Sequence, residues 1–285
     1  MKFCCGITLY YPTDEELNIA KKYENIFEKI YLFDNTEGNS ILKNKKSFYN
    51  LEKYTYISFN ENKGLAEAYN IMCKKAITDG FDYILLLDQD SIILKNDLMN
   101  MINYIEKEDS KDIGVFLPNI LYNHMKEEML IKSDFITNNE VEWGISSGSF
   151  INLYIYSKTL GFDEKYFIDR LDYDYCICIR KMGYKIVRIK NAYLHQALGE
   201  SVKRWNKCIS QHNSIRHYYI FRNRLYFYFK KNNRSIYNLN KSITLSLNHV
   251  IRIIFLEDNK IEKIRMILEA YKDFSRNKMG KYYRK

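Results

Sequence analysis

Short apolar runs bounded by polar residues recur through the first part of the chain. They are rich in Ile, Leu, Phe and Tyr and are four to seven residues long, which is typical of buried strands. A chain with this pattern can bury both faces of a sheet. The strands expected on this basis cover residues 3–9, 30–33, 54–59, 83–87, 113–117 and 185–189.

Segments whose apolar residues recur every three or four positions separate these runs and predict helices. One covers residues 15–27, with Thr13 or Asp14 as its cap, and another begins at Gly64 and ends at Gly80. Repeated strand–helix–strand units predict an α/β fold with a mostly parallel central sheet flanked by helices. Further helices are expected at 96–106 and 172–181.

The pattern changes beyond residue 211, where long helical spacing replaces the alternation. We therefore expect an α/β domain at 1–210 and a C-terminal helical extension at 211–285. Within the first domain, residues 119–142 are mixed and polar, which predicts a hairpin and a loop. The three helices expected in the extension cover 217–230, 241–255 and 261–274.

Composition narrows the possible functions. The 285 residues are 46% hydrophobic and carry a net charge of +9, which suits an anionic substrate, an anionic membrane surface or nucleic acid. The charges are spread without a known nucleic-acid-reading module, so nucleic-acid binding is disfavoured. The six cysteines lack zinc-like spacing and are expected to be free thiols in a reducing compartment. With no signal peptide and no apolar run near the ~20 residues that span a bilayer, we expect a cytoplasmic protein.

The most informative chemistry follows the apolar run at 84–87, which ends in Asp88 and Asp90. Alternate strand residues share a face, so both carboxylates can converge just past the strand's carboxyl end. Open α/β sheets bind their ligands at this edge. Two hard oxygen donors there suit Mg²⁺ or Mn²⁺ completed by a diphosphate, although a solvated acidic turn would show the same short pattern.

Other polar segments fall at comparable places. Asp34 ends the second strand, where a carboxylate can accept hydrogen bonds from a nucleotide base or ribose. Gly64 permits a tight turn into a helix whose free N–H groups suit an anion, and Asn62 and Asn70 lie beside it. A simple turn and a capped helix are the structural alternatives.

A second group of candidates lies further along the chain. Trp143 could stack on a sugar face, and the small residues at 146–149 let a backbone approach a ligand closely. Asp172 is placed as a helix N-cap but could act as a general base, and Asp174 follows as a helix-dipole partner. His195 follows a predicted strand and could complete a metal site that holds Asp90.

In their order and spacing, these segments resemble an inverting family 2 glycosyltransferase with the GT-A (Rossmann-like) fold, and more closely its bacterial rhamnosyltransferase-like branch. The resemblance runs from about residue 6 to 223. Relatives often carry Val-Asp-x-Glu-Trp where this chain has the segment 171–175, so the base-type Asp is kept but acceptor contacts differ. The motifs are Asp34-Asn35, Asn62-x-Gly64-x-Ala66-x-Ala68-x-Asn70, Leu87-Asp88-Gln89-Asp90-Ser91, Ser146-Ser147-Gly148-Ser149, Phe167-Ile168-Asp169-x-x-Asp172-x-Asp174-Tyr175, His195-x-x-Leu198-Gly199 and Tyr218-Tyr219-x-x-Arg222-Asn223.

The resemblance implies specific roles, with a nucleotide-sugar half at about 1–118 and an acceptor half at about 119–210. Asp172 would deprotonate the acceptor hydroxyl, while Asp90 and His195 would bind Mg²⁺ or Mn²⁺ on the donor diphosphate. The implied donor-site residues are Thr8, Asp34, Asn62, Gly64, Asn70, Asp88 and Arg222. The implied acceptor-site residues are Trp143, Ser147, Gly148 and Asp174.

The expected activity is transfer of a sugar, with rhamnose from dTDP-rhamnose favoured, to a saccharide or lipid-linked saccharide in cell-surface polysaccharide synthesis. A UDP-hexose or UDP-galactofuranose donor is the nearest alternative, and a non-catalytic scaffold of the same fold is the alternative of another class. The basic, aromatic C-terminal helices predict either contact with the inner face of an anionic plasma membrane or a homodimer.

Overall fold

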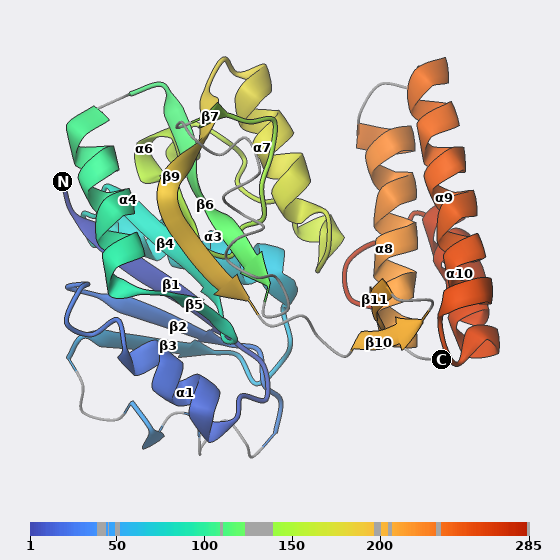
Figure 1. Ribbon diagram of the computed structural model, residues 1–285, viewed down its shortest axis with the longest axis horizontal. Helices are drawn as coiled ribbons and strands as arrows, with labels where there is room; N and C mark the ends of the chain where they lie inside the picture. The colour runs from blue at the N-terminus through green and yellow to red at the C-terminus, as the bar shows by residue number, and fades with distance from the viewer. Residues whose placement is uncertain are drawn as a thin grey trace. The chain divides into compact units, whose positions relative to one another are not determined.

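The computed structural model of the chain forms two compact units (Figure 1). The first contains Met1–Asp163 and Asp172–Ala197, and the second contains Glu164–Leu171 and Leu198–Lys285. The second unit therefore takes in a short segment from the middle of the first. The structure describes residues 1–38, 44, 46–48, 52–108, 111–122, 139–196, 201–204, 207–231 and 235–283.

The first unit is built on a nine-stranded mixed sheet with the order β3-β2-β1-β4-β8-β6-β9-β5, and β7 pairs with β9 outside this path. The first four strands in that order run parallel, as do β6 and β9, whereas β8, β5 and β7 are antiparallel to their neighbours. The strands are β1 (Phe3–Leu9), β2 (Ile30–Asp34), β3 (Tyr54–Ser58), β4 (Tyr83–Asp88), β5 (Ser91–Ile93), β6 (Ile113–Tyr122), β7 (Asn139–Glu140), β8 (Ser149–Asn152) and β9 (Lys185–Gln196).

Helices cover both faces of this sheet (Figure 1). On one face, α1 (Asp14–Lys21) and α4 (Lys95–Glu108) bury leucines and isoleucines against the central strands. On the other, α3 (Gly64–Thr78) packs Met72 closely over Gly6 of β1, where a Cβ would lie only 3.0 Å from the Met72 sulfur. Among the described residues, the first unit also contains α6 (Leu153–Ser157) and most of α7 (Leu171–Lys181), and a short 3₁₀ turn at Glu164–Tyr166 belongs to the second unit.

The expected α/β class is confirmed, and the differences from the expected elements are local. Thr13 is the N-cap of α1 in a capping box with Glu16, and the helix ends at Lys21 instead of residue 27. The strand expected at 113–117 continues to Tyr122, so the hairpin and loop expected from residue 119 were wrong over its first residues. Pro118 interrupts the apolar pattern of the sequence at this point. In the structure β6 continues through it, with a shift in register against β9 between Leu117 and Asn119.

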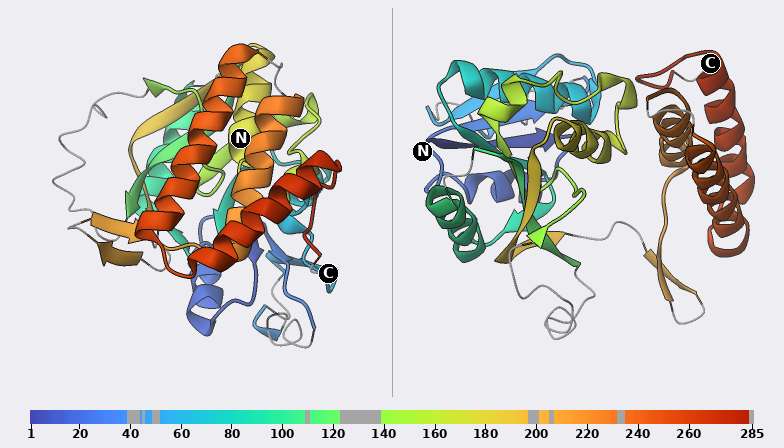
Figure 2. Two further views of the ribbon diagram at one scale, coloured as in Figure 1. Left: turned by 90° about the vertical axis from the view of Figure 1, so that its right-hand side faces the viewer. Right: turned by 90° about the horizontal axis from the view of Figure 1, so that it is seen from above.

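The second unit is helical, with a small hairpin. Helices α8, α9 and α10 pack around a core that contains Tyr218, Ile253 and Ala270 (Figure 2). In the described part of the chain, no helix has the length and hydropathy needed to cross a bilayer. The elements are β10 (Ser201–Arg204), β11 (Lys207–Ser210), α8 (Ser214–Tyr226), a π-helical turn (Phe227–Lys231), α9 (Ile236–Leu256) and α10 (Lys260–Ser275).

The three helices share a buried polar network centred on Glu257, whose side chain is fully buried. Its carboxylate lies 2.8 Å from His217 Nε2, 2.9 Å from Lys263 Nζ and 3.2 Å from Arg252 Nε. The other ring nitrogen of His217 is 2.7 Å from Nε2 of His249. Burial lowers the pKa of both histidines, that of His249 to about 3, so both rings are neutral in the folded protein.

This network predicts that the helical unit loses stability in mild acid. Below the ordinary histidine pKa of about 6.5 the unfolded chain binds protons that His217 and His249 do not accept when folded, so the free energy of unfolding falls with pH. The slope approaches about 1.4 kcal/mol per pH unit for each histidine. Thermal unfolding of the full chain, followed by circular dichroism at pH 7 and pH 5, would measure it. The variant His249→Asn should lose part of this dependence, since burial also lowers the pKa of His212, to about 4; an equal pH dependence in both proteins would contradict the assignment.

Among the described cysteines, five are free, as expected: Cys4, Cys5, Cys73, Cys176 and Cys178. The side chain of Cys208 lies outside the described residues.

Candidate active site

Asp88 is the last residue of β4, at the carboxyl edge of the sheet. Its register partner in the neighbouring strand β1 is Thr8, whose hydroxyl lies 3.5 Å from the Asp88 carboxylate. From α3, the buried Tyr69 hydroxyl donates a hydrogen bond to the same carboxylate oxygen at 3.2 Å. The strand-end carboxylate is therefore held in a fixed position, as parallel strands with a covering helix allow.

The turn that follows Asp88 is held by Ser147. Its buried hydroxyl accepts a hydrogen bond from the Asp88 backbone N–H at 3.0 Å and donates one to Ser91 Oγ at 2.9 Å. On the other side, Gln89 accepts from the Tyr10 backbone N–H at 2.7 Å. The residues on both sides of Asp90 are therefore held by hydrogen bonds, and Asp90 itself is exposed to solvent.

The acceptor-site role expected for Ser147 and Gly148 stays a prediction, because their contacts are with the protein itself. Gly148 has a φ of +82°, donates its N–H to the Leu86 carbonyl at 2.7 Å, and has no room for a Cβ beside Pro118 and Leu194. Both residues thus fix the turn that carries Asp90.

Replacing Ser147 with alanine should loosen this turn without unfolding the protein. The change removes two hydrogen bonds from a buried site, at a cost of about 1–3 kcal/mol. We expect donor affinity to fall about tenfold, which corresponds to about 1.4 kcal/mol. Calorimetric titration with nucleotide diphosphate and Mn²⁺ would measure it, with Ser157→Ala in α6 as the matched control. Unchanged affinity in Ser147→Ala would show that the turn does not depend on this hydroxyl.

Asp172 lies in the first turn of α7, half-buried, and accepts a hydrogen bond from the Tyr173 N–H at 2.9 Å. The helix begins at Leu171, so the expectation that Asp172 is its N-cap was wrong by two positions, and Asp172 is the second residue of the helix. Burial, followed by the charges of Asp88 and Asp172, raises the pKa of the Tyr69 hydroxyl. The charges of both carboxylates thus reach one hydroxyl, although only Asp88 forms a hydrogen bond with it.

Aromatic side chains stand beside Asp172. Trp143, which is 46% exposed, makes an edge-to-face contact with Tyr173 at 5.2 Å between ring centroids. The Cys176 thiol approaches the Gly144 carbonyl at 3.9 Å, so α7 is held along the turn that carries Trp143. An open indole face next to a carboxylate is suited to a sugar ring.

Asp174 is only 4% exposed, so its side chain faces the interior of the unit. The acceptor contact expected for it stays a prediction, and its burial disfavours direct contact with a sugar in this conformation.

Asp34 ends β2 with its carboxylate fully buried. It accepts hydrogen bonds from the Thr36 N–H and the Asn44 side-chain amide, each at 2.8 Å, and from the Tyr56 hydroxyl. These bonds shape the loop after β2, and a contact with base or ribose remains a prediction for this residue.

The residues expected around the start of α3 are brought together as a scaffold. Asn62 accepts from the Gly64 N–H at 2.9 Å, and Gly64 has a φ of +81°. Asn35 accepts from the Lys63 N–H at 2.8 Å, so the end of β2 supports the start of this helix. Asn70 is buried and bonds both backbone groups of Phe162, which assigns it to holding that loop.

His195 lies within β9, not after a strand as expected, because β9 continues to Gln196. His195 pairs with Ile92 of the edge strand β5, and Ile92 is two residues after Asp90 in the sequence. Among the described residues, no three carboxylate, imidazole or thiol side chains are preassembled as a metal site. A divalent ion here would take part of its shell from a substrate. Leu198 and Gly199, which complete this motif, lie outside the described residues.

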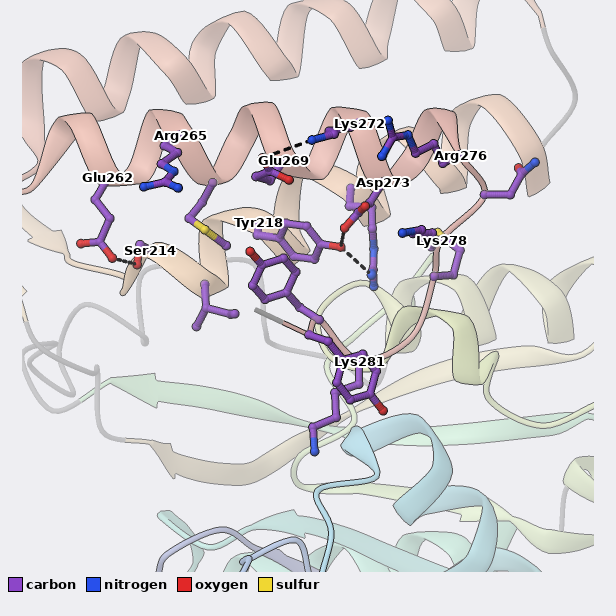
Figure 3. Close-up of a pocket in the computed structure, with 17 residues that line it drawn as sticks. Ser214, Tyr218, Glu262, Arg265, Glu269, Lys272, Asp273, Arg276, Lys278 and Lys281 are labelled. Atoms are coloured by element: carbon purple, nitrogen blue, oxygen red, sulfur yellow. Dashed lines mark hydrogen bonds and ion pairs between the residues drawn. The ribbon is translucent and has the colours of Figure 1, made fainter. Parts of the chain in front are cut away.

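Arg222 belongs to the helical unit, where it is 1% exposed. Its guanidinium donates to the Tyr218 hydroxyl at 3.1 Å and stacks over Tyr218 and Tyr219. It lines a pocket of about 740 Å³ between α8, α10 and the residues that follow (Figure 3). The contact with donor phosphates expected for Arg222 stays a prediction. The other charged residues of this pocket are Arg265, Lys272, Arg276, Lys278, Lys281, Glu262, Glu269 and Asp273.

Asn223, next to Arg222, holds the segment that precedes Asp172. Its side-chain amide donates to the carbonyls of Tyr166, Ile168 and Asp169 at 2.9, 2.6 and 3.1 Å. Such support is needed because several non-glycine residues of this segment have a left-handed backbone, among them Asp169 with a φ of +63°. The Tyr-Tyr-x-x-Arg-Asn motif thus has a structural role in the helical unit.

Two contributions were missed at the level of sequence. Tyr69 was read only as part of an apolar helical stripe, and its hydroxyl gave no separate signal. Tyr10 and Tyr11 follow β1 directly, half exposed and edge to face at 4.8 Å, beside the strand-end loops. Their position after a parallel strand was the signal that could have identified them.

Comparisons with known proteins bear on the family and the fold of the chain. Residues 12–128 match the model of glycosyl transferase family 2. The chain is 28% identical over 289 residues to the dTDP-rhamnosyl transferase RfbF of Shigella flexneri, covering 96% of this chain and 95% of that protein.

Solved structures share the fold at low identity. S. aureus TarS 1–349 in complex with UDP-GlcNAc has a TM-score of 0.59 and 15% identity, over 96% of this chain and 80% of that one. The mannosyltransferase PcManGT from Pyrobaculum calidifontis, in complex with GDP-Man and Mn²⁺, has a TM-score of 0.56 and 10% identity, over 96% and 75%. Residues 12–128 thus match glycosyl transferase family 2, the fold is GT-A-like, and these findings together with the rhamnosyltransferase relative support a glycosyltransferase.

Proposed function

We propose that this enzyme transfers a sugar, with inversion, from a nucleotide sugar to a saccharide acceptor in bacterial cell-surface polysaccharide synthesis. The observation that carries the proposal is the Tyr69 hydroxyl, which donates a hydrogen bond to Asp88 and whose pKa is also raised by the charge of Asp172. It supports a strand-end donor site and a base on α7 in one neighbourhood, as a direct displacement requires.

In this mechanism Asp172 takes the proton from the acceptor hydroxyl as that oxygen attacks the anomeric carbon. The nucleoside diphosphate leaves from the opposite face, so no covalent intermediate with the protein is needed. Trp143 and Tyr173 hold the acceptor ring beside the base, and a positioned base contributes roughly 10²–10⁴-fold to the rate.

The donor chemistry calls for Mg²⁺ or Mn²⁺, and the residues present fit such an ion. Asp90 is an exposed carboxylate on a turn fixed by Ser147, and Mg²⁺ is commonly held by one or two carboxylates together with substrate phosphates. His195 is our candidate for a further ligand. When bound, the ion neutralises charge that develops on the leaving diphosphate.

The favoured donor is dTDP-rhamnose, because the relative that covers almost the whole chain is a dTDP-rhamnosyl transferase. A UDP-hexose or UDP-galactofuranose is the alternative donor. The structure of TarS, which was solved with UDP-GlcNAc, is the reason to test UDP-sugars as well. The acceptor is proposed to be a saccharide or a lipid-linked saccharide.

A donor panel tests this proposal. Binding and slow hydrolysis of dTDP-rhamnose, UDP-glucose, UDP-galactofuranose and GDP-mannose would be measured with Mn²⁺ and with EDTA. We expect one donor, dTDP-rhamnose, to bind in a metal-dependent way and to be hydrolysed. Metal-dependent binding of a UDP-sugar alone would replace the rhamnose assignment. Failure of every donor to bind would favour the non-catalytic scaffold.

A further inference from the structure

Helix α9 presents a long apolar stripe to solvent. Ile243, Leu247 and Ile251 are 48%, 58% and 52% exposed, and they recur every four residues along one side of the helix. The stripe spans most of the 21-residue helix, or about 30 Å. We refer to it as the α9 stripe. Its full set is Ile236, Tyr237, Leu239, Ile243, Leu247, Ile251, Ile254 and Phe255.

The opposite side of α9 already serves the fold. Ser242, His249 and Ile253 are its buried residues, and His249 joins the polar network around Glu257. Most of the large apolar side chains of the helix therefore lie on its exposed side. An apolar surface of this size on one helix is uncommon in a protein without a further partner.

Charge identifies that partner. Residues 211–285 contain 17 Lys and Arg but only 5 Asp and Glu, a net charge of +12, whereas the whole chain carries +9. The preceding 210 residues therefore carry a net charge of −3, and the excess of positive charge belongs to the helical region. Helix α9 contains Lys241 and Arg252 and no Asp or Glu.

An apolar stripe on a strongly basic unit is complementary to a bilayer with anionic lipids. Interfacial helices combine an apolar face with Lys and Arg, and each cation near an anionic leaflet adds about 1 kcal/mol of attraction. A second copy of the same unit is less complementary, because residues 211–285 carry a net charge of +12 and two such regions would repel each other. The absence of acidic residues on α9 leaves no ion pairs for such an interface.

We propose that the α9 stripe lies in the interface of an anionic membrane, parallel to its surface, and attaches the enzyme there. The attachment does not depend on which sugar is transferred. It would bring a glycosyltransferase to acceptors that are carried on lipid.

Vesicle flotation of the full-length protein tests this attachment. The probes are vesicles of phosphatidylcholine alone and vesicles with equal amounts of phosphatidylcholine and phosphatidylglycerol, each at low and high salt. The wild type should bind the anionic vesicles at least tenfold more than the neutral ones, and high salt should reduce this binding. The double variant Leu247→Glu/Ile251→Glu should lose at least tenfold in partitioning.

Leu160→Glu is the matched control, because this leucine is fully exposed in the first unit, and it should bind like the wild type. Thermal melting checks that every variant is folded, and donor binding measured without vesicles reports on the proposed enzymatic function separately. Equal binding by the double variant, or no binding to anionic vesicles, would overturn the proposal. A dimer that dissociates in the double variant, without vesicle binding, would overturn it and assign the stripe to a second copy.

Discussion

Asparagine at position 172 should lower kcat by roughly 10²–10⁴-fold, because the amide has the shape of the carboxylate but cannot accept the acceptor's proton. Donor affinity should stay within about twofold of the wild type, since the Tyr69 contact that orders the donor edge is made by Asp88. Steady-state transfer kinetics together with donor binding by calorimetry would measure both quantities.

Asp112→Asn is the control for this variant. Asp112 directly precedes β6, at the amino end of that strand. It makes a half-exposed ion pair with Lys185 at 2.7 Å. Its loss should leave kcat unchanged and affect stability by no more than about 1 kcal/mol. If Asp172→Asn kept full turnover, the base would have to be another group.

Alanine at position 90 should abolish the metal dependence of donor binding. The exposed Asp90 carboxylate is the protein ligand we assign to the ion. Without it the protein would no longer hold the ion that neutralises the charge of the diphosphate. We expect kcat/KM to fall by about 10²–10³-fold, equivalent to about 3–4 kcal/mol. The comparison is between Mn²⁺ and EDTA in donor titrations of the wild type and the variant.

Glu28→Ala removes an equally exposed carboxylate at the opposite end of β2 and should retain the full metal response. Metal-dependent donor binding that persists in Asp90→Ala would move the ion to other ligands. Replacing His195 with Ala would then show whether the imidazole contributes.

The framework of the fold could be predicted because its signals are redundant. Each parallel strand is a continuous apolar run, and Gly64 and Gly80 mark the limits of α3 with left-handed backbones of φ +81°. The missed strands are different in kind. β5 has three residues, and β8 has four, two of them the buried polar Ser149 and Asn152, so neither offers a hydrophobic pattern to detect.

The site was predictable as a location and less so as a set of contacts. Asp88 could be placed at a strand end because it closes an apolar run, and Asp172 could be placed near a helix start by the pattern that follows it. Sequence could not reveal that Asp34 already accepts three hydrogen bonds inside the protein, or that Ser147 bridges the Asp88 turn. A side chain's partners depend on loops from distant parts of the chain, whose packing leaves no periodic trace.

The segment Glu164–Leu171, which the helical unit shares, has a consequence for how the enzyme is made. The ribosome produces this segment about fifty residues before Asn223, whose amide holds three of its carbonyls. Until α8 has emerged, the strained backbone before Asp172 has no partner for these groups. In a nascent or prematurely ended chain, the segment before Asp172, our proposed base, would therefore lack the support of Asn223, and we expect transfer activity only once α8 is present.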